Sequence, residues 1–335
     1  MGVFRILVGT ILGGLKQLLL EVKDLRMYYE VGDGVFVKAV DGVSFNLDRE
    51  EALGIVGESG CGKSSLAITI LRILPSNARV LGGEVLLDGV DILRLDEHRL
   101  RKEVRWRKIS MVFQGSMNAL NPIIKVGDQI AEAIMLHEKV SKKDAYRRAE
   151  ELLSLVGIDP SRVSSYPFEL SGGQRQRVMI AMALALNPKV LIADEPTTAL
   201  DVIVQAQTLK LIKELQSRLK LSLMLISHDI SVVAEMSDKV AVMYAGKIVE
   251  YGPAVEVLLQ PKHPYTTALL KSVPSIRESK RKLAYIPGVP PNLVNPPSGC
   301  RFHPRCPYAM DICREKEPNL KEVGEHHLAA CHLYR

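Results

Sequence analysis

Short apolar runs and helical patterns alternate in the first third of the chain. β-Branched and apolar residues predict strands at residues 20–27 and 35–47, and residues 53–56 form a continuous apolar run typical of a strand buried in a parallel sheet. Apolar residues at helical spacing over residues 64–74 predict a helix directly after that run, and turns bound a further strand at residues 84–87. The strand–loop–helix order is typical of a nucleotide-binding unit.

The pattern changes between residues 118 and 186, where it predicts helices only. These helices are expected at residues 126–136, 142–156 and 174–186. Strand-like runs then return at residues 190–193, 223–227 and 240–244. An amphipathic helix over residues 204–219 separates the first two runs, which suits a right-handed crossover between parallel strands. The sequence therefore predicts an α/β sheet interrupted by an all-helical insertion.

The two ends of the chain differ from this pattern. Beyond residue 252 the sequence becomes proline-rich, which disfavours regular structure and predicts a small C-terminal extension. The apolar residues 6–15 are too few to span a membrane, which takes roughly twenty, and no signal-peptide cleavage site follows them. The predicted organisation is an N-terminal extension, a main domain with its helical insertion, and the C-terminal extension, at residues 1–19, 20–252 (insertion about 116–186) and 253–335.

Composition adds little to this organisation. Apolar residues make up 47% of the 335 residues and charged residues 24%, values typical of soluble globular proteins, which argues against a disordered chain or a polytopic membrane protein. The net charge is +6, and a basic cluster at residues 99–108 raises the alternative of nucleic-acid binding. Because acidic residues interleave with that cluster, we interpret it as a solvated face.

A phosphate-binding pattern follows the buried strand at residues 53–56. Residues 57–64, here called the phosphate loop, read Gly-Glu-Ser-Gly-Cys-Gly-Lys-Ser between a strand and a helix, the context that this motif requires. Glycines let backbone amides surround phosphates, Lys63 reaches the β- and γ-phosphates, and Ser64 ligates Mg²⁺. The predicted nucleotide-binding positions are Gly57, Ser59, Gly60, Cys61, Gly62, Lys63, Ser64 and Ser65.

Two acidic residues, Asp194 and Glu195, end the apolar run at residues 190–193. A carboxylate at the end of a buried strand is what a Mg²⁺-nucleotide site requires, and Asp194 is predicted to fill that role. Glu195 then stands where a general base would act on the attacking water. By themselves the two acids are also compatible with an exposed strand end, so the prediction depends on their combination with the phosphate loop.

A third motif, Leu170-Ser171-Gly172-Gly173-Gln174, opens the last helix of the insertion. This motif resembles the signature of ATP-binding-cassette ATPases. The resemblance implies a P-loop NTPase with a RecA-like core, an antiparallel β subdomain and an all-helical signature subdomain. It also implies that the signature residues of one subunit bind the γ-phosphate held by a partner subunit. The positions expected to act in trans are Ser171, Gly172, Gly173, Gln174 and Asp201.

The same resemblance assigns further residues. Gln114 matches the glutamine that contacts Mg²⁺ and the attacking water, and His228 matches the histidine that contacts the γ-phosphate. Tyr29 matches the aromatic residue that stacks on adenine, with Tyr28 as a neighbouring alternative. The implied catalytic residues are Glu195, His228, Gln114 and Lys63, and the implied Mg²⁺ ligands are Ser64, Gln114 and Asp194.

The C-terminal extension resembles that of oligopeptide and dipeptide permease ATPases, at residues 263–266, 286–288 and 299–307. It carries four cysteines: Cys300, Cys306, Cys313 and Cys331. Disulfides are disfavoured in a reducing compartment, and the spacing lacks the close cysteine pairs of most zinc sites. Both the spacing and the resemblance favour a [4Fe–4S] cluster, with Zn²⁺ as the alternative.

The resemblance implies an ATP- and Mg²⁺-dependent subunit of an importer, peripheral on the cytoplasmic face of the membrane, that powers uptake of dipeptides or oligopeptides. Its implied partners are a second cassette ATPase, two transmembrane permease subunits and, indirectly, an extracytoplasmic peptide-binding protein. Nickel or another small solute remains an alternative cargo, because nickel importers have related extensions. A non-transport ATPase acting on nucleic acid is disfavoured, because the chain has one phosphate loop and only a short separation between Gln114 and Ser171.

Overall fold

The structure is a computed structural model that describes residues 18–115, 118–272 and 286–334. The N-terminal extension predicted at residues 1–19, including its apolar stretch, lies almost entirely outside the described residues. Among the described residues, no helix combines the length and the apolar character needed to cross a membrane.

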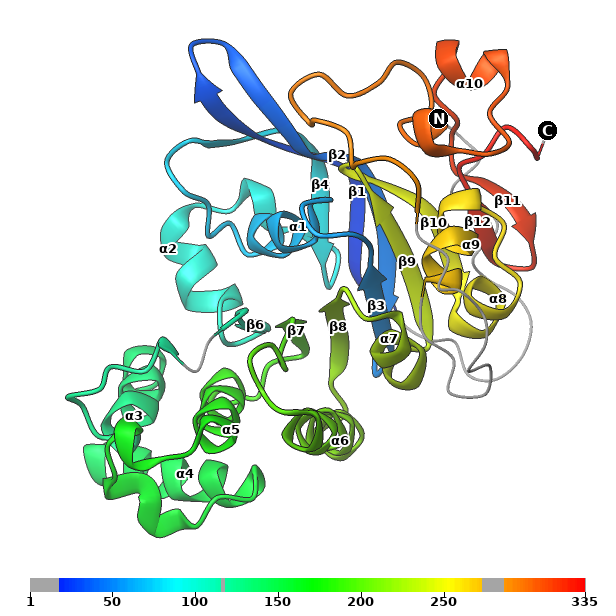
Figure 1. The fold of residues 1–335 in the computed structure, drawn as a ribbon. Coiled ribbons are helices and arrows are strands. Elements are labelled where there is room, and N and C mark those ends of the chain that lie inside the picture. The colour runs from blue at the N-terminus through cyan, green and yellow to red at the C-terminus, as the bar shows by residue number, and fades with distance from the viewer. Residues whose placement is uncertain (1–17, 116–117, 273–285, 335) are drawn as a thin grey trace.

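A mixed eight-stranded sheet forms the centre of the fold, in the order β11-β12-β10-β9-β3-β8-β7-β6 (Figure 1). Five neighbouring strands of this sheet are parallel: β9 (Lys239–Tyr244), β3 (Ala52–Val56), β8 (Ser222–Ser227), β7 (Val190–Asp194) and β6 (Ile109–Val112). Every residue of β3, β7 and β8 is buried, which confirms the strands predicted from continuous apolar runs.

Alternate residues of the parallel strands enter two different hydrophobic cores. On β8, Met224 and Ile226 belong to a core shared with the helix α1 (Lys63–Ile70), whereas Leu223 and Leu225 pack with the helix α6 (Val202–Leu219). The two-residue period of a strand sends neighbouring side chains to opposite faces, so both faces of the sheet are covered. A short helix, α7 (Ile230–Met236), follows β8 and packs against β3.

A second, antiparallel sheet lies on the α1 side, in the order β2-β1-β4-β5. Its strands are β1 (Leu18–Gly32), β2 (Val35–Asp48), β4 (Ala78–Leu87) and β5 (Val90–Asp91). Leu66, Ala67 and Ile70 of α1 share one apolar cluster with residues of both sheets. The helix that follows the phosphate loop is therefore held between the two sheets.

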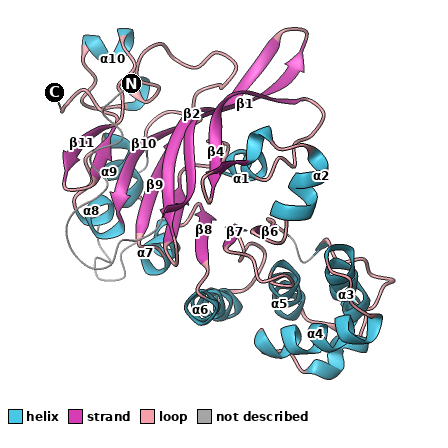
Figure 2. Ribbon diagram, turned by 180° about the vertical axis from the view of Figure 1, so that it is seen from behind, coloured by secondary structure: helices cyan, strands magenta, loops and turns pink. Residues whose placement is uncertain are grey.

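The segment between β6 and β7 is helical, as predicted, and projects away from both sheets (Figures 1 and 2). Its helices are α3 (Val126–His137), α4 (Lys142–Leu155) and α5 (Gly172–Ala183). Helix α5 starts two residues earlier than the periodicity indicates, because Ser171 and Gln174 form a reciprocal capping box at its first turn. A very short helix, α2 (Glu97–Arg99), precedes β6.

The C-terminal extension contains more regular structure than its prolines indicate. Strand β10 (Lys247–Pro253) leads into helices α8 (Ala254–Leu259) and α9 (Pro264–Lys271), and α9 has a proline at its first position, where a helix accepts one. Residues 286–302 have neither helix nor strand, in keeping with the prolines. The last elements are α10 (Asp311–Glu315), β11 (Lys321–Gly324) and β12 (His327–Ala329). Since β12 pairs with β10, the extension adds two strands to the central sheet.

We expect Phe302→Ala to destabilise the chain by about 3–5 kcal/mol, because Phe302 is a core residue of the C-terminal extension. Its side chain is fully buried, with ring centroids 5.2 Å from Tyr244 and 5.4 Å from Tyr265. Urea unfolding measures the effect. The control is Tyr308→Ala, which removes an exposed ring in the same extension and should change stability by less than about 0.5 kcal/mol. Equal losses in the two variants would contradict this account.

Candidate nucleotide-binding site

The phosphate loop connects the end of β3 to the start of α1. Gly60 and Gly62 have φ angles of +79° and +107°, which only glycine adopts without strain. A Cβ on Gly62 would also lie 2.0 Å from the Ala39 carbonyl oxygen. The loop is thus packed tightly against β2, and its turn leads directly into the first backbone amides of α1, where the helix dipole favours an anion.

Lys63 is the first residue of α1 and is only 5% exposed. Its side chain points toward the start of the phosphate loop, where Nζ donates hydrogen bonds to the carbonyl oxygens of Gly57 at 2.7 Å and Glu58 at 3.1 Å. These carbonyls satisfy a buried cation that would otherwise have lost its hydration. The cation therefore lies within the curve of the loop, where the sequence predicts that it meets phosphate.

Asp194 lies at the end of β7 and is 3% exposed. Burial raises the pKa of its carboxyl, whereas a hydrogen bond with Ser64 opposes the rise. Its Oδ1 atom is buried without a hydrogen-bond partner among the described residues. An unpartnered carboxylate oxygen beside a serine hydroxyl is a donor set that suits Mg²⁺, which prefers oxygen ligands. These two residues therefore fit the predicted metal.

Glu195 follows Asp194 and receives contacts from two neighbouring strand ends. Its Oε2 atom accepts a hydrogen bond from Gln114 Nε2 at 2.8 Å, after β6, and Oε1 lies 3.0 Å from His228 Nδ1, after β8. Thr198 Oγ donates to Oε2 at 3.1 Å. Gln114, Glu195 and His228 are far apart in the sequence and meet at one edge of the parallel sheet. Ligands of open α/β sheets bind at this edge. Of the three predicted Mg²⁺ ligands, Ser64 and Asp194 contact each other, whereas Gln114 donates its hydrogen bond to Glu195.

The two neighbouring tyrosines of β1 have different surroundings. The hydroxyl of Tyr29 lies 3.0 Å from Ser65 Oγ on α1. The hydroxyl of Tyr28 instead donates to Asp41 at 2.7 Å, and burial together with that hydrogen bond raises the Tyr28 pKa to about 12. Tyr29 therefore lies beside the phosphate-loop helix, whereas Tyr28 is engaged by β2.

The residues predicted to act in trans are not part of this cluster. Ser171 caps α5, and Asp201 caps α6 by accepting from the amides of Ile203 and Val204 at 3.1 and 3.0 Å. The two helix starts lie together, since a Cβ on Gly173 would lie 2.6 Å from Val204 Cγ1. No hydrogen bond among the described residues joins Ser171, Gly172, Gly173 or Gln174 to the phosphate loop.

Two residues of the site were missed in the sequence. Thr198 donates a hydrogen bond to Glu195. Its position three residues after an acid at a strand end is a sequence feature that could have indicated this contact. Gln176 is buried in α5, and its Nε2 donates to the Pro196 carbonyl at 2.6 Å, immediately after Glu195. Nothing in the helical periodicity distinguishes a buried glutamine that braces a neighbouring loop from one that faces solvent.

The four C-terminal cysteines are free thiols that neighbour one another, and Cys300 donates its amide to the Cys313 carbonyl at 2.8 Å. Burial raises the Cys300 pKa to about 11, and the other three cysteines add to the rise. Within the described residues, no group of three or more histidine, cysteine or acidic side chains is placed to hold a metal ion. The predicted [4Fe–4S] cluster and its Zn²⁺ alternative, with Cys300, Cys306, Cys313 and Cys331 as ligands, therefore have no support here.

Comparisons with known proteins agree with this geometry. The family described as "ABC transporter" matches residues 40–198, and "Oligopeptide/dipeptide transporter, C-terminal region" matches residues 249–313. The "Oligopeptide transport ATP-binding protein OppD" of Bacillus subtilis is 50% identical over 92% of this chain and 87% of its own length. The protein of the same name from Escherichia coli is 49% identical, over 93% and 92%. The "Dipeptide transport ATP-binding protein DppD" of Caldanaerobacter subterraneus is 45% identical, over 95% and 98%.

A solved structure extends the similarity to three dimensions. It is described as a "Dimeric structure of a post-hydrolysis state of the ATP-binding cassette MJ0796 bound to ADP and Pi". The two chains superpose with a TM-score of 0.63 at 28% sequence identity, over 70% of this chain and 99% of the other.

We expect Asp194→Asn to raise the thermal midpoint of the nucleotide-free protein. The folded chain raises the Asp194 pKa above its ordinary value of 3.8. Stability therefore falls as the pH rises from 3.8 through the raised value, and it stays lower at neutral pH because the folded state must hold an unfavourable charge. The gain should shrink toward pH 4, where wild-type Asp194 is increasingly protonated. Calorimetry over this pH range checks the effect, and a gain that is independent of pH would contradict it.

Proposed function

The chain belongs to the ATPases of the ATP-binding-cassette transporters, and we propose that it powers the uptake of dipeptides and oligopeptides across the cytoplasmic membrane. The observation that carries the choice of peptide is the match of residues 249–313 to the C-terminal region of oligopeptide and dipeptide transporters. The printed names of relatives that are 45–50% identical support it. Nickel or another small solute is the alternative cargo.

In the proposed reaction, the phosphate loop and Lys63 bind the phosphates of ATP, and Ser64 and Asp194 hold Mg²⁺. When bound, Mg²⁺ neutralises charge on the β- and γ-phosphate oxygens. Lys63 exchanges its two loop carbonyls for phosphate oxygens, and Tyr29 stacks on adenine from β1. The unpartnered Asp194 Oδ1 atom supports this assignment, because a bound cation supplies the partner that it lacks.

Glu195 is the proposed general base. It takes a proton from water as the water oxygen forms a bond to the γ-phosphorus and the bond to the β-phosphate oxygen breaks, which yields ADP and phosphate. Gln114 and Thr198 both donate to Oε2 and so fix the orientation of the carboxylate. His228, at Oε1, is proposed to contact the γ-phosphate. A carboxylate held by three neighbours needs little reorganisation during the reaction.

The proposed assembly has each nucleotide between two cassettes. Ser171, Gly172, Gly173, Gln174 and the N-terminus of α5 would complete the site of a second ATPase subunit, with Asp201 at the same interface. The exposed side chains of Val202 and Ile203, 80% and 71% accessible beside Asp201, support a contact surface at that point. ATP-driven closure of the pair would then shift the transporter between its two states.

The remaining partners are two transmembrane permease subunits and, indirectly, an extracytoplasmic peptide-binding protein. The proposed permease contact lies near residues 118–126, after Gln114, where Ile123 is 81% exposed and Gln129 holds the backbone through Asn121 and Ile124. The proposed location of the chain is peripheral, on the cytoplasmic face of the membrane. The proposal includes ATP and Mg²⁺ and requires no iron–sulfur cluster and no nucleic acid.

We expect Glu195→Gln to abolish ATP turnover and peptide uptake while MgATP still binds, because the phosphate-binding groups remain when the base is lost. Lys63→Ala should instead lose MgATP binding. The assays are ATPase rate and uptake of a labelled dipeptide by proteoliposomes that contain the complete transporter, with labelled nickel as the competing cargo. Wild-type turnover in Glu195→Gln would refute the assignment of the base, and uptake of nickel but not peptide would refute the cargo.

We expect Ser171→Arg to reduce ATPase activity of the assembled transporter about a hundredfold, because it removes a donor aimed at the γ-phosphate of the partner's site. MgATP binding to the isolated chain should be unchanged. Ser141→Arg is the matched control, since Ser141 caps α4 as Ser171 caps α5, so both variants lose a helix cap. Full activity of Ser171→Arg, or an equal loss in Ser141→Arg, would show that the sites are not shared.

A further inference from the structure

The C-terminal extension contacts the phosphate loop through Arg305. The guanidinium group donates from Nη1 to Glu58 Oε2 at 2.6 Å and from Nη2 to Glu58 Oε1 at 2.9 Å, a bidentate ion pair. Arg305 is 7% exposed, and its Nε donates to the Pro287 carbonyl at 2.8 Å. Glu58 is the second residue of the loop, so residues that lie almost 250 positions apart form this pair.

The main chain of Glu58 also forms hydrogen bonds, in addition to the ion pair of its carboxylate. Its amide donates to the Tyr265 hydroxyl on α9 at 2.9 Å. Its carbonyl accepts from Lys63 Nζ at 3.1 Å and from the Cys61 amide at 3.2 Å. Two of the groups that hold Glu58, Arg305 and Tyr265, therefore come from the C-terminal extension rather than from the nucleotide-binding motif.

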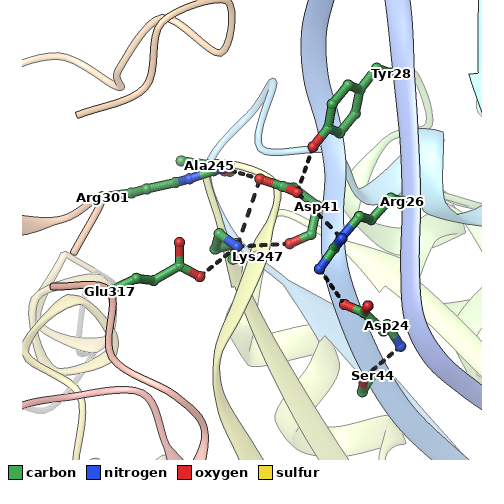
Figure 3. Close-up of polar contacts among 9 residues, drawn as sticks. All are labelled: Asp24, Arg26, Tyr28, Asp41, Ser44, Ala245, Lys247, Arg301 and Glu317. Atoms are coloured by element: carbon green, nitrogen blue, oxygen red, sulfur yellow. Dashed lines mark hydrogen bonds and ion pairs between the residues drawn. The ribbon is translucent and has the colours of Figure 1, made fainter. Parts of the chain in front are cut away.

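The extension has a second attachment to the rest of the domain, through Arg301 and Glu317 (Figure 3). Arg301 donates to the Ala245 carbonyl and to the Asp41 carboxylate on β2. Lys247 donates to the Asp41 carbonyl at 3.0 Å and pairs with Glu317 at 2.6 Å. Arg301 is as buried as Arg305, at 7% exposed, so the extension has two buried arginines with different partners.

We propose that Arg305 is a positioning residue that holds the phosphate loop in its ATP-binding shape through Glu58. This inference rests on the proposed function, in which Lys63 leaves the loop carbonyls to meet phosphate. Glu58 then loses one of its contacts and keeps the Cys61 amide together with Arg305 and Tyr265 of the C-terminal extension. Because backbone amides bind phosphate only when they converge, a loop freed at its second residue presents fewer of them to the ligand. Arg305 touches neither nucleotide nor metal in this arrangement and acts only through Glu58.

The test is equilibrium binding of MgATP to the full chain. We expect Arg305→Gln and Glu58→Gln each to weaken MgATP binding on the order of tenfold, because each substitution breaks the buried bidentate ion pair that holds the second residue of the loop. The double variant should bind no worse than either single variant, because each substitution removes the same contact. Arg305→Lys keeps the charge without the bidentate geometry and should bind with intermediate affinity.

Arg301→Gln is the matched control, because it removes an equally buried arginine of the same extension whose partners lie outside the phosphate loop. It should lower the thermal midpoint and leave MgATP affinity within about twofold of wild type. Equal loss of affinity in Arg301→Gln and Arg305→Gln, wild-type affinity in both Arg305→Gln and Glu58→Gln, or additive losses in the double variant would overturn the proposal. Failure of wild-type protein to bind MgATP would refute the proposed function itself.

Discussion

Parallel pairing of β6, β7, β8 and β3 brings the carboxyl ends of four strands to one edge of the central sheet. The phosphate loop follows β3, Asp194 ends β7, and Gln114, Glu195 and His228 follow β6, β7 and β8. Each of these positions depends on the register of a strand, and every residue of β3, β7 and β8 is buried. A slip of one residue would exchange the two hydrophobic cores, so the same apolar packing that stabilises the sheet also fixes the geometry of the polar groups at its edge.

The charged side chains at that edge differ in the partners that satisfy them. Lys63 is buried and takes its partners from loop carbonyls, and Asp194 is buried with one oxygen unpartnered. A folded state that holds such groups is less stable than one with ordinary pairs, which is the usual consequence of preparing a site for a charged ligand. Glu195 differs, because three neighbours satisfy its carboxylate and set its orientation.

The C-terminal extension is joined to the nucleotide-binding domain by strand pairing, aromatic packing and ion pairs. Its strand β12 pairs with β10, its aromatic residues pack around Tyr244, and its buried arginines reach β2 and the phosphate loop. The extension therefore contributes contacts to the phosphate loop from residues that lie outside the cassette motifs. The cysteine cluster that the spacing suggested is a different case, because within the described residues these side chains are not placed to hold a metal ion.

The sequence by itself determined the buried strands, the helical insertion and the phosphate loop. These depend on local patterns: continuous apolar runs, helical spacing and glycines where backbone must approach a ligand. It placed the start of α5 two residues late, because the periodicity does not include the glycines that follow the cap residue Ser171. Only the tertiary structure decided which tyrosine lies beside α1, that Gln176 donates to the Pro196 carbonyl, and that Arg305 pairs with Glu58. Those contacts join residues that are brought together by packing, or choose between side chains that are equivalent in sequence, and periodicity along a chain carries no information about either.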